Sequence, residues 1–360
     1  MIRLCRILLA VSLCLALSAC GLAAIPTPVA TPAPTQGLQG GLQYLSAQSL
    51  TGGIPAVVER ISPAVVGLAV TTSQSTEFGR QAVEGLGSGV VVDGQGYILT
   101  NNHVAGQALQ IDVVLADGSM RPGKLVWTDK ALDLAVVKAE GGPYPAAEMG
   151  TSQGLRVGDT VITIGTPLTL NFQHTVTGGI VSALRRTLKV TTDDGLSFME
   201  ELIQTDAPIN PGNSGGPLCD MGGRVVGINT LKVSEAEGIG FAIPIEIAKP
   251  IVERIKAEGS YDTPYLGLYA IDAEIARYYG QEGITGGILV INLDAEGPAR
   301  EAGLRKGDLI THMDGNPVST VLGMRQVIYS HKAGESIPIR WERDGKANEA
   351  PVTLAKKPVE

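Results

Sequence analysis

The sequence predicts a mainly β fold, divided between a larger domain and a smaller α+β domain. A chain of 360 residues is long enough for two domains, each with its own core. It contains 46 glycines and 21 prolines but only 4% aromatic residues, a balance that suits short strands joined by tight turns. Between Val65 and Ile243, short runs rich in β-branched residues alternate with turn residues. This spacing is typical of a β-sandwich or a β-barrel.

The first 20 residues have the three parts of an export signal. Arg3 and Arg6 precede the apolar run 7–17, and small residues follow it. The run is too short for a comfortable transmembrane helix. Leu17-Ser18-Ala19-Cys20 resembles the lipobox of bacterial lipoproteins, which implies that residues 1–19 are a signal peptide and that Cys20 is lipidated. An ordinary secretory signal with a coincidental cysteine is the alternative.

Residues 20–53 are expected to form a flexible tether between a membrane and the folded domains. From Ile25 to Gly53 the chain is rich in Pro, Thr, Gly and Gln, has almost no charge and shows no periodicity. Because three of the four cysteines lie within the first 20 residues, no disulfide framework is expected after cleavage. Cys219 follows Pro217-Leu218 in a predicted strand and is expected to be a small buried hydrophobe.

The larger domain is expected over residues 54–259. Its predicted strands are Val65–Val70, Gly89–Val92, Tyr97–Thr100, Ile111–Leu115, Leu134–Val137, Thr160–Ile164, Gly179–Leu184, Val225–Ile228 and Gly240–Ile243. A helix should close the domain, because Ile247, Ile251 and Ile255 recur every four residues. Gly259 is a suitable stop for this helix.

A second domain is expected over residues 260–357, after a boundary at Ser260–Pro264. Strands are predicted at Gly287–Asn292, Asp308–Met313 and Ile337–Trp341, and a helix at Leu322–His331. Asp314-Gly315 is a tight-turn signal. The mixture of strands and helix predicts a small α+β domain.

The strongest chemical signal is Gly212-Asn213-Ser214-Gly215-Gly216-Pro217. A serine hydroxyl is a weak nucleophile, and it needs a base and hydrogen-bond donors for the developing oxyanion. The glycines allow a sharp turn that leaves room for a substrate chain. The backbone amides of Gly212 and Ser214 could then face the substrate carbonyl oxygen. A glycine-rich serine loop alone is also a common turn.

Two further residues make the signal specific. His103 follows a predicted strand, and Asp133 opens another. The order His103, Asp133, Ser214 is that of the chymotrypsin-like double β-barrel. An isolated Asp is usually a turn residue and an isolated His a surface residue, so the prediction depends on their combination.

The chain resembles the HtrA (Deg) family of serine proteases over residues 54–357. The matching segments are Ile61–Val66, Gly87–Val91, Tyr97–Val104, Asp133–Val136, Gly178–Ala183, Gln204–Leu218 and Gly240–Pro244. The resemblance implies a serine-type endopeptidase in which His103 is the general base, Asp133 orients it and Ser214 is the nucleophile. The amides of Gly212 and Ser214 would form the oxyanion hole.

The same resemblance implies substrates, assembly and location. It implies acyl-enzyme hydrolysis of unfolded or damaged extracytoplasmic proteins, by a homotrimer built through Ile54–Val70. Its specificity pocket would include Ile209 and Leu231, and Pro208 lies six residues before Ser214, where an acidic residue would favour basic substrates. Cleavage after small or medium aliphatic residues is therefore expected. Location outside the cytoplasm, on a membrane through lipidated Cys20, is the accompanying expectation.

Tyr265-Leu266-Gly267-Leu268 resembles the carboxylate-binding loop of a PDZ domain. Residues 297–310 resemble the helix, glycine turn and strand that follow in such domains. The resemblance implies that a C-terminal peptide binds here by adding a strand to a sheet edge. A β-rich dimerisation module is the alternative.

The remaining candidates do not predict a second chemistry. His174 lies in a segment that the family uses as an activation loop, and His312 and His331 have no expected carboxylate neighbour. No spacing of His, Cys or carboxylates is typical of a metal site, so no metal or cofactor is expected. The net charge of −8 does not indicate a nucleic-acid partner. Two other functions stay open: a chaperone that holds misfolded chains, and a regulatory protease for one membrane partner.

Overall fold

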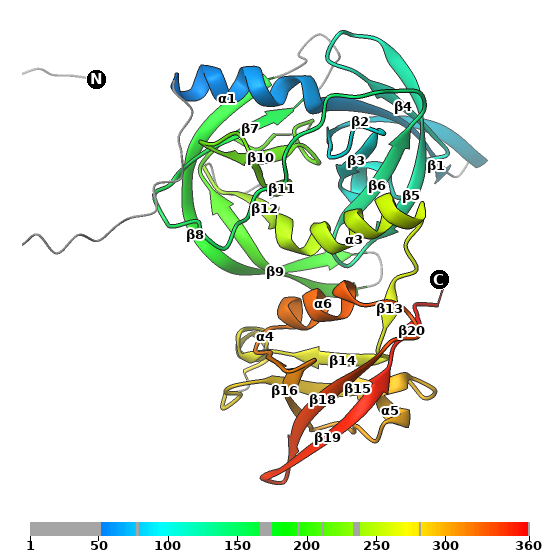
Figure 1. Cartoon of the computed structure of the whole chain (residues 1–360), viewed down its shortest axis with the longest axis vertical. Coiled ribbons are helices and arrows are strands. Elements are labelled where there is room, and N and C mark those ends of the chain that lie inside the picture. Colours follow the sequence, from blue (N-terminus) through cyan, green and yellow to red (C-terminus); the bar gives the residue numbers. More distant parts are fainter. Residues whose placement is uncertain are drawn as a thin grey trace, which may run out of the picture. The chain divides into compact units, whose positions relative to one another are not determined.

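The computed structural model describes residues 52–360 except 77–78, 166–174, 193–194, 211, 233–237, 281 and 359–360 (Figure 1). The predicted signal peptide, Cys20, nearly all of the tether and His174 lie outside the described residues. None of the described helices is long and apolar enough to cross a membrane.

The first six strands form a closed antiparallel barrel. Helix α1 (Gly53–Ile61) and a short 3₁₀ turn (Ser62–Ala64) precede it. The strands are β1 (Val65–Thr76), β2 (Gly79–Val91), β3 (Tyr97–Thr100), β4 (Gln110–Val114), β5 (Met120–Asp129) and β6 (Leu134–Ala139). Their order around the barrel is β1-β2-β3-β6-β5-β4, and β1 closes it by pairing with both β2 and β4.

The next six strands form a second closed barrel. They are β7 (Thr160–Gly165), β8 (Thr175–Thr192), β9 (Gly195–Thr205), β10 (Pro217–Asp220), β11 (Val225–Lys232) and β12 (Gly240–Pro244). Their order is β10-β11-β12-β9-β8-β7. The predicted mainly β domain is therefore confirmed as a double β-barrel.

Helix α3 (Ile245–Glu258) follows β12 and ends where the sequence predicts. Ile247, Ile251 and Ile255 are all fully buried, because their spacing puts them on one face of the helix. Gly259 adopts a left-handed conformation with φ 76°, and its amide donates a hydrogen bond to the carbonyl of Ile255. This is the glycine termination typical of helix C-termini.

The described part of the second domain has a main sheet, a two-stranded sheet and three helices. The main sheet has the strand order β14-β15-β16-β18-β19, with β17 beside β16, and β13 pairs with β20. The strands are β13 (Pro264–Tyr265), β14 (Leu268–Ile271), β15 (Ile288–Leu293), β16 (Leu309–Met313), β17 (Asn316–Pro317), β18 (Ser336–Arg343), β19 (Lys346–Thr353) and β20 (Ala355–Lys356). The helices are α4 (Ala273–Tyr278), α5 (Pro298–Glu301) and α6 (Val321–Ser330).

The predicted turn at Asp314-Gly315 joins β16 to β17. Its two residues have φ 48° and 73°, the positive values of the tight turns that match strand twist. Both domains belong to one compact unit. Most of their buried hydrophobic residues form one core cluster that extends from Val57 to Leu354, and six buried residues of the second barrel form another.

Candidate active site

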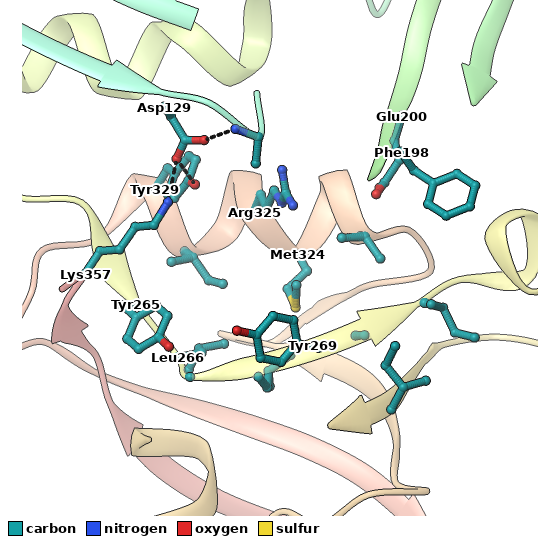
Figure 2. Close-up of a pocket in the computed structure, with 18 of the residues that line it drawn as sticks. Asp129, Phe198, Glu200, Tyr265, Leu266, Tyr269, Met324, Arg325, Tyr329 and Lys357 are labelled. Atoms are coloured by element: carbon teal, nitrogen blue, oxygen red, sulfur yellow. Dashed lines mark hydrogen bonds and ion pairs between the residues drawn. The ribbon is translucent and has the colours of Figure 1, made fainter. Parts of the chain in front are cut away.

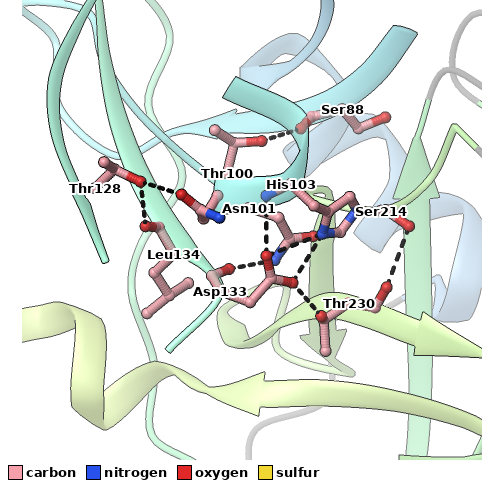
Figure 3. A network of polar contacts seen from close by, with 10 residues as sticks. Ser88, Thr100, Asn101, His103, Thr128, Asp133, Leu134, Ser214 and Thr230 are labelled. Atoms are coloured by element: carbon pink, nitrogen blue, oxygen red, sulfur yellow. Dashed lines mark hydrogen bonds and ion pairs between the residues drawn. The ribbon is translucent and has the colours of Figure 1, made fainter. Parts of the chain in front are cut away.

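Three segments bring His103, Asp133 and Ser214 together (Figure 3). His103 lies in the short helix α2 (Asn102–Ala105) after β3, Asp133 in the turn before β6, and Ser214 in the turn before β10. Nδ1 of His103 is 2.9 Å from each carboxylate oxygen of Asp133. Because a carboxylate only accepts, Nδ1 carries the proton in this contact, and Nε2 is left as the acceptor.

Asp133 is held from three further directions. Its φ of 53° is unusual for a residue with a side chain. The backbone amide of His103 donates to Oδ1 at 3.0 Å, and the side-chain amide of Asn101 donates to the Asp133 carbonyl at 2.9 Å. Oγ1 of Thr230 donates to Oδ2 at 2.5 Å. The carboxylate is therefore fixed in position, with its side chain 13% exposed.

The Ser214 hydroxyl donates to the backbone carbonyl of Thr230 at 3.3 Å. Within the described part of the chain, no hydrogen bond joins Ser214 to the His103 ring. Such contacts are often long without substrate and tighten when substrate binds.

The loop before Ser214 makes a tight turn with two free amides. Gly212 has φ 106°, and the Asn213 amide donates to the Asn210 carbonyl at 3.1 Å, as in a turn with glycine at its third position. The Gly212 carbonyl is engaged by Oγ of Ser88 at 2.5 Å. Among the described residues, neither the Gly212 amide nor the Ser214 amide donates a hydrogen bond, so both are available to an oxyanion.

Of the two predicted pocket residues, the side chain of Ile209 is described and that of Leu231 is not. Ile209 is 4% exposed. A methyl group at Gly240 would come within 2.4 Å of Cγ1 of Ile209, so the glycine makes room for the isoleucine. Leu231 lies in β11, directly after Thr230. The same strand therefore carries a predicted pocket residue, Leu231, and the threonine whose hydroxyl donates to the Asp133 carboxylate.

The predicted carboxylate-binding loop lines a cavity of about 460 Å³ (Figure 2). All four residues from Tyr265 to Leu268 contribute to its wall, together with β14 and with Met324 and Ile328 of α6. Gly267 has φ 69°, and a methyl group there would lie 2.7 Å from Cα of Gly297. Only glycine therefore suits this loop. Asp129, Phe198 and Glu200 of the first domain also line the cavity.

Two other expectations are decided by the structure. His331 lies between Asp314, at 3.3 Å, and Glu335, at 3.0 Å, so the expectation that it has no carboxylate neighbour was wrong. The turn after β16 brings Asp314 to it from a distant part of the sequence. Cys219 is a free, fully buried cysteine as predicted, and burial raises the pKa of its thiol. Within the described ranges, no group of three His, Cys, Asp or Glu residues has the arrangement of a metal site.

Three supports of the site were not predicted from the sequence: Thr230, Ser88 and Asn101. All three are buried polar residues within or beside apolar strands. A buried polar side chain needs a hydrogen-bond partner. A polar residue inside a predicted buried strand was therefore the available signal.

Comparisons with known proteins agree with this architecture. Residues 87–228 match the trypsin-like peptidase domain and residues 264–354 the PDZ domain. The chain is 38% identical over 328 residues to the serine protease Do-like HtrA of Bacillus subtilis, covering 84% of this chain and 73% of that protein. It is 38% identical over 286 residues to a probable periplasmic serine endoprotease DegP-like of Pseudomonas fluorescens, covering 78% and 58%.

Solved structures give the same assignment. An HtrA-type protease AlgW with a tripeptide superimposes with a TM-score of 0.66 at 36% identity, covering 85% of this chain and 98% of that one. A serine endoprotease from Yersinia pestis gives a TM-score of 0.59 at 32% identity, covering 84% and 98%. The chain therefore belongs to the HtrA family of serine proteases, with a trypsin-like protease domain and one PDZ domain.

Proposed function

We propose that this serine endopeptidase hydrolyses peptide bonds through an acyl-enzyme, with Ser214 as nucleophile, His103 as general base and Asp133 as the residue that orients His103. The observation that carries the proposal is the contact of Nδ1 of His103 with both oxygens of Asp133, 2.9 Å each. This contact holds the imidazole in the tautomer that can accept a proton at Nε2.

In the proposed reaction, the Ser214 hydroxyl turns from the Thr230 carbonyl to Nε2 of His103. His103 takes its proton as Oγ attacks the substrate carbonyl carbon, and then gives that proton to the leaving amine. Water hydrolyses the resulting ester by the same route. The amides of Gly212 and Ser214 stabilise the oxyanion in both steps. Donors of this kind typically contribute about 2.7–4 kcal/mol each to the transition state.

We propose that the enzyme cleaves after small or medium aliphatic residues. Ile209 and Leu231 would form the apolar wall of the pocket, and Pro208 offers no charge for a basic side chain. Peptide substrates that differ only at the residue before the scissile bond test this. Val or Ala should be cleaved faster than Arg or Lys, and the opposite order would refute the pocket assignment.

Unfolded or damaged extracytoplasmic proteins are the proposed substrates, with C-terminal peptides as ligands of the PDZ domain. The names of the Pseudomonas relatives, which are probable periplasmic endoproteases, support this location. The cavity beside Gly267 supports peptide binding. A regulatory protease that is switched by such a peptide is the second candidate, because protease residues Phe198 and Glu200 also line the cavity.

We propose a domain boundary between residues 259 and 260, a lipidated Cys20 and a homotrimer formed through Ile54–Val70. The end of α3 at Glu258 and the start of β13 at Pro264 support the boundary. Cys20→Ser should release the protein from membranes, whereas continued anchoring would contradict lipidation. Sedimentation equilibrium should give three times the monomer mass, and a monomer would refute the trimer.

The first experiment compares residues 54–360 with its Ser214→Ala variant in casein digestion and in labelling by a fluorophosphonate. Loss of both activities in the variant establishes the nucleophile. Labelling that survives in Ser214→Ala would overturn the assignment. An aggregation assay with the same two proteins tests the chaperone function. If Ser214→Ala cleaves nothing but still protects unfolded chains from aggregation, the protein has a holding function that does not require peptide-bond hydrolysis.

A further inference from the structure

A buried carboxylate outside the triad lies four residues before Asp133. This is Asp129, the last residue of β5, whose side chain is 2% exposed. A buried carboxylate is costly unless its oxygens are hydrogen-bonded or paired. Both oxygens of Asp129 are occupied, and their partners come from two different domains.

One oxygen of Asp129 builds the turn that leads to Asp133. Oδ1 accepts hydrogen bonds from the amides of Ala131, at 2.9 Å, and Leu132, at 3.1 Å. The Asp133 amide then donates to the Lys130 carbonyl at 3.3 Å. Asp133 leaves this turn with the left-handed φ of 53°, a conformation that costs a side-chain-bearing residue energy and must be held by its surroundings. The direction of the Asp133 carboxylate therefore depends on the position of Asp129.

The other oxygen of Asp129 is held by the PDZ domain. Oδ2 accepts a hydrogen bond from the hydroxyl of Tyr329 at 3.2 Å and lies 3.4 Å from Nζ of Lys357 (Figure 2). Tyr329 belongs to α6, the helix that also forms one wall of the peptide cavity. Lys357 directly follows β20, the last strand of the chain.

Tyr329 itself has little freedom to move. It is 7% exposed, and its ring packs edge-on against Tyr261 with 6.4 Å between ring centres. The hydroxyl of Tyr261 donates to the backbone carbonyl of Tyr329 at 3.1 Å. Burial and the nearby Asp129 raise the pKa of Tyr329, so its hydroxyl keeps its proton and acts as a donor.

We propose that Asp129 is a positioning residue for the triad, and that Tyr329 and Lys357 of the PDZ domain hold it in place. The chemical step therefore depends on two side chains that lie outside the protease domain. This dependence exists without any peptide in the cavity. The proposal rests on the proposed function, in which Asp133 orients His103.

The test is Tyr329→Phe in the whole mature chain, which removes one oxygen and keeps the ring. We expect kcat for a short chromogenic peptide to fall about five- to tenfold, with KM unchanged. The acid limb of the pH profile of kcat/KM should move to lower pH, because a displaced Asp133 stabilises the imidazolium less. Lys357→Met should also lower kcat and move the acid limb to lower pH, with smaller changes than Tyr329→Phe.

Tyr278→Phe is the matched control. It removes the hydroxyl of another tyrosine of the PDZ domain, and that hydroxyl donates to the Thr187 carbonyl of the protease domain rather than to Asp129. The control should keep the kcat and pH profile of the unmodified enzyme. Equal losses in Tyr329→Phe and Tyr278→Phe, or no change in Tyr329→Phe, would overturn the proposal. Fluorophosphonate labelling of the unmodified enzyme and of Ser214→Ala separates this result from a failure of the triad assignment, in which the unmodified enzyme is not labelled or Ser214→Ala still is.

Discussion

Thr230 donates a hydrogen bond from Oγ1 to Oδ2 of Asp133 at 2.5 Å, across 97 positions of sequence. The backbone carbonyl of the same threonine accepts the Ser214 hydroxyl. One residue of β11 thus contacts both ends of the proposed triad. Its side chain fixes the carboxylate, and its carbonyl binds the Ser214 hydroxyl.

Thr230→Val should lower kcat/KM about tenfold, because Asp133 loses one of the bonds that aim it at His103 while the carbonyl to Ser214 is kept. The measurement is hydrolysis of a short peptide, with the unfolding midpoint checked in parallel. Thr230→Ser is the control, since it retains a hydroxyl. If valine and serine variants lose activity equally, the hydrogen bond to Asp133 is not the cause.

Gly212→Ala should lower kcat about 10²- to 10³-fold, the usual loss when an oxyanion-hole donor is misplaced. Gly212 has φ 106°, which a residue with a Cβ adopts only with strain, so alanine should reorient the amide. Steady-state kinetics with casein or a chromogenic peptide measures the loss. Gly154→Ala is the control, because Gly154 has open space around its Cα and no positive φ. A Gly212→Ala enzyme of normal kcat would rule out this oxyanion hole.

Gly267→Ala should abolish binding of hydrophobic C-terminal peptides without abolishing basal cleavage. The new methyl group would lie 2.7 Å from Cα of Gly297, so the loop must shift. Fluorescence anisotropy of a labelled peptide measures the affinity. Gly259→Ala has a comparable left-handed strain, with φ 76°, at the end of α3 and no close neighbour. The Gly259→Ala variant should still bind the peptide. Loss of binding in both variants would point to general destabilisation of the domain instead of a change in the Gly267 loop.

Glu200→Gln should change how stability depends on pH. Burial raises the pKa of Glu200 from 4.5 to about 7 in the folded protein, so the folded state binds this proton more tightly than the unfolded state. The contribution of Glu200 is fully present below pH 4.5 and is lost as pH rises through about 7. The loss is at most about 3 kcal/mol.

The Gln variant lacks this titration, so it should unfold less readily than the unmodified protein at pH 8 and should show a smaller decline between pH 4.5 and 7. Denaturant unfolding at several pH values measures the difference. Glu253→Gln, at an exposed position of α3, is the control, and its free energy of unfolding should depend on pH as that of the unmodified protein does. The same pH dependence in Glu200→Gln would contradict the prediction.

Many elements of the fold were predictable from the sequence alone, and so was the grouping of His103 with Asp133, whereas α1, β5, β9 and β19 were not predicted. Strand runs, the isoleucine spacing of α3 and its stop at Gly259 are local patterns, and local patterns report the backbone conformation of their own segment. His103, Asp133 and Ser214 were found because each follows or opens a strand in a characteristic order.

Only the tertiary structure decided what supports and connects these residues. Thr230 meets Asp133, and Tyr329 meets Asp129 across 200 positions, because folding brings distant segments together and buries their polar groups in pairs. No local periodicity encodes such a contact. The hydrogen bond of Ser214 to the Thr230 carbonyl and the shared lining of the peptide cavity have the same origin, since both depend on how separate strands and helices pack.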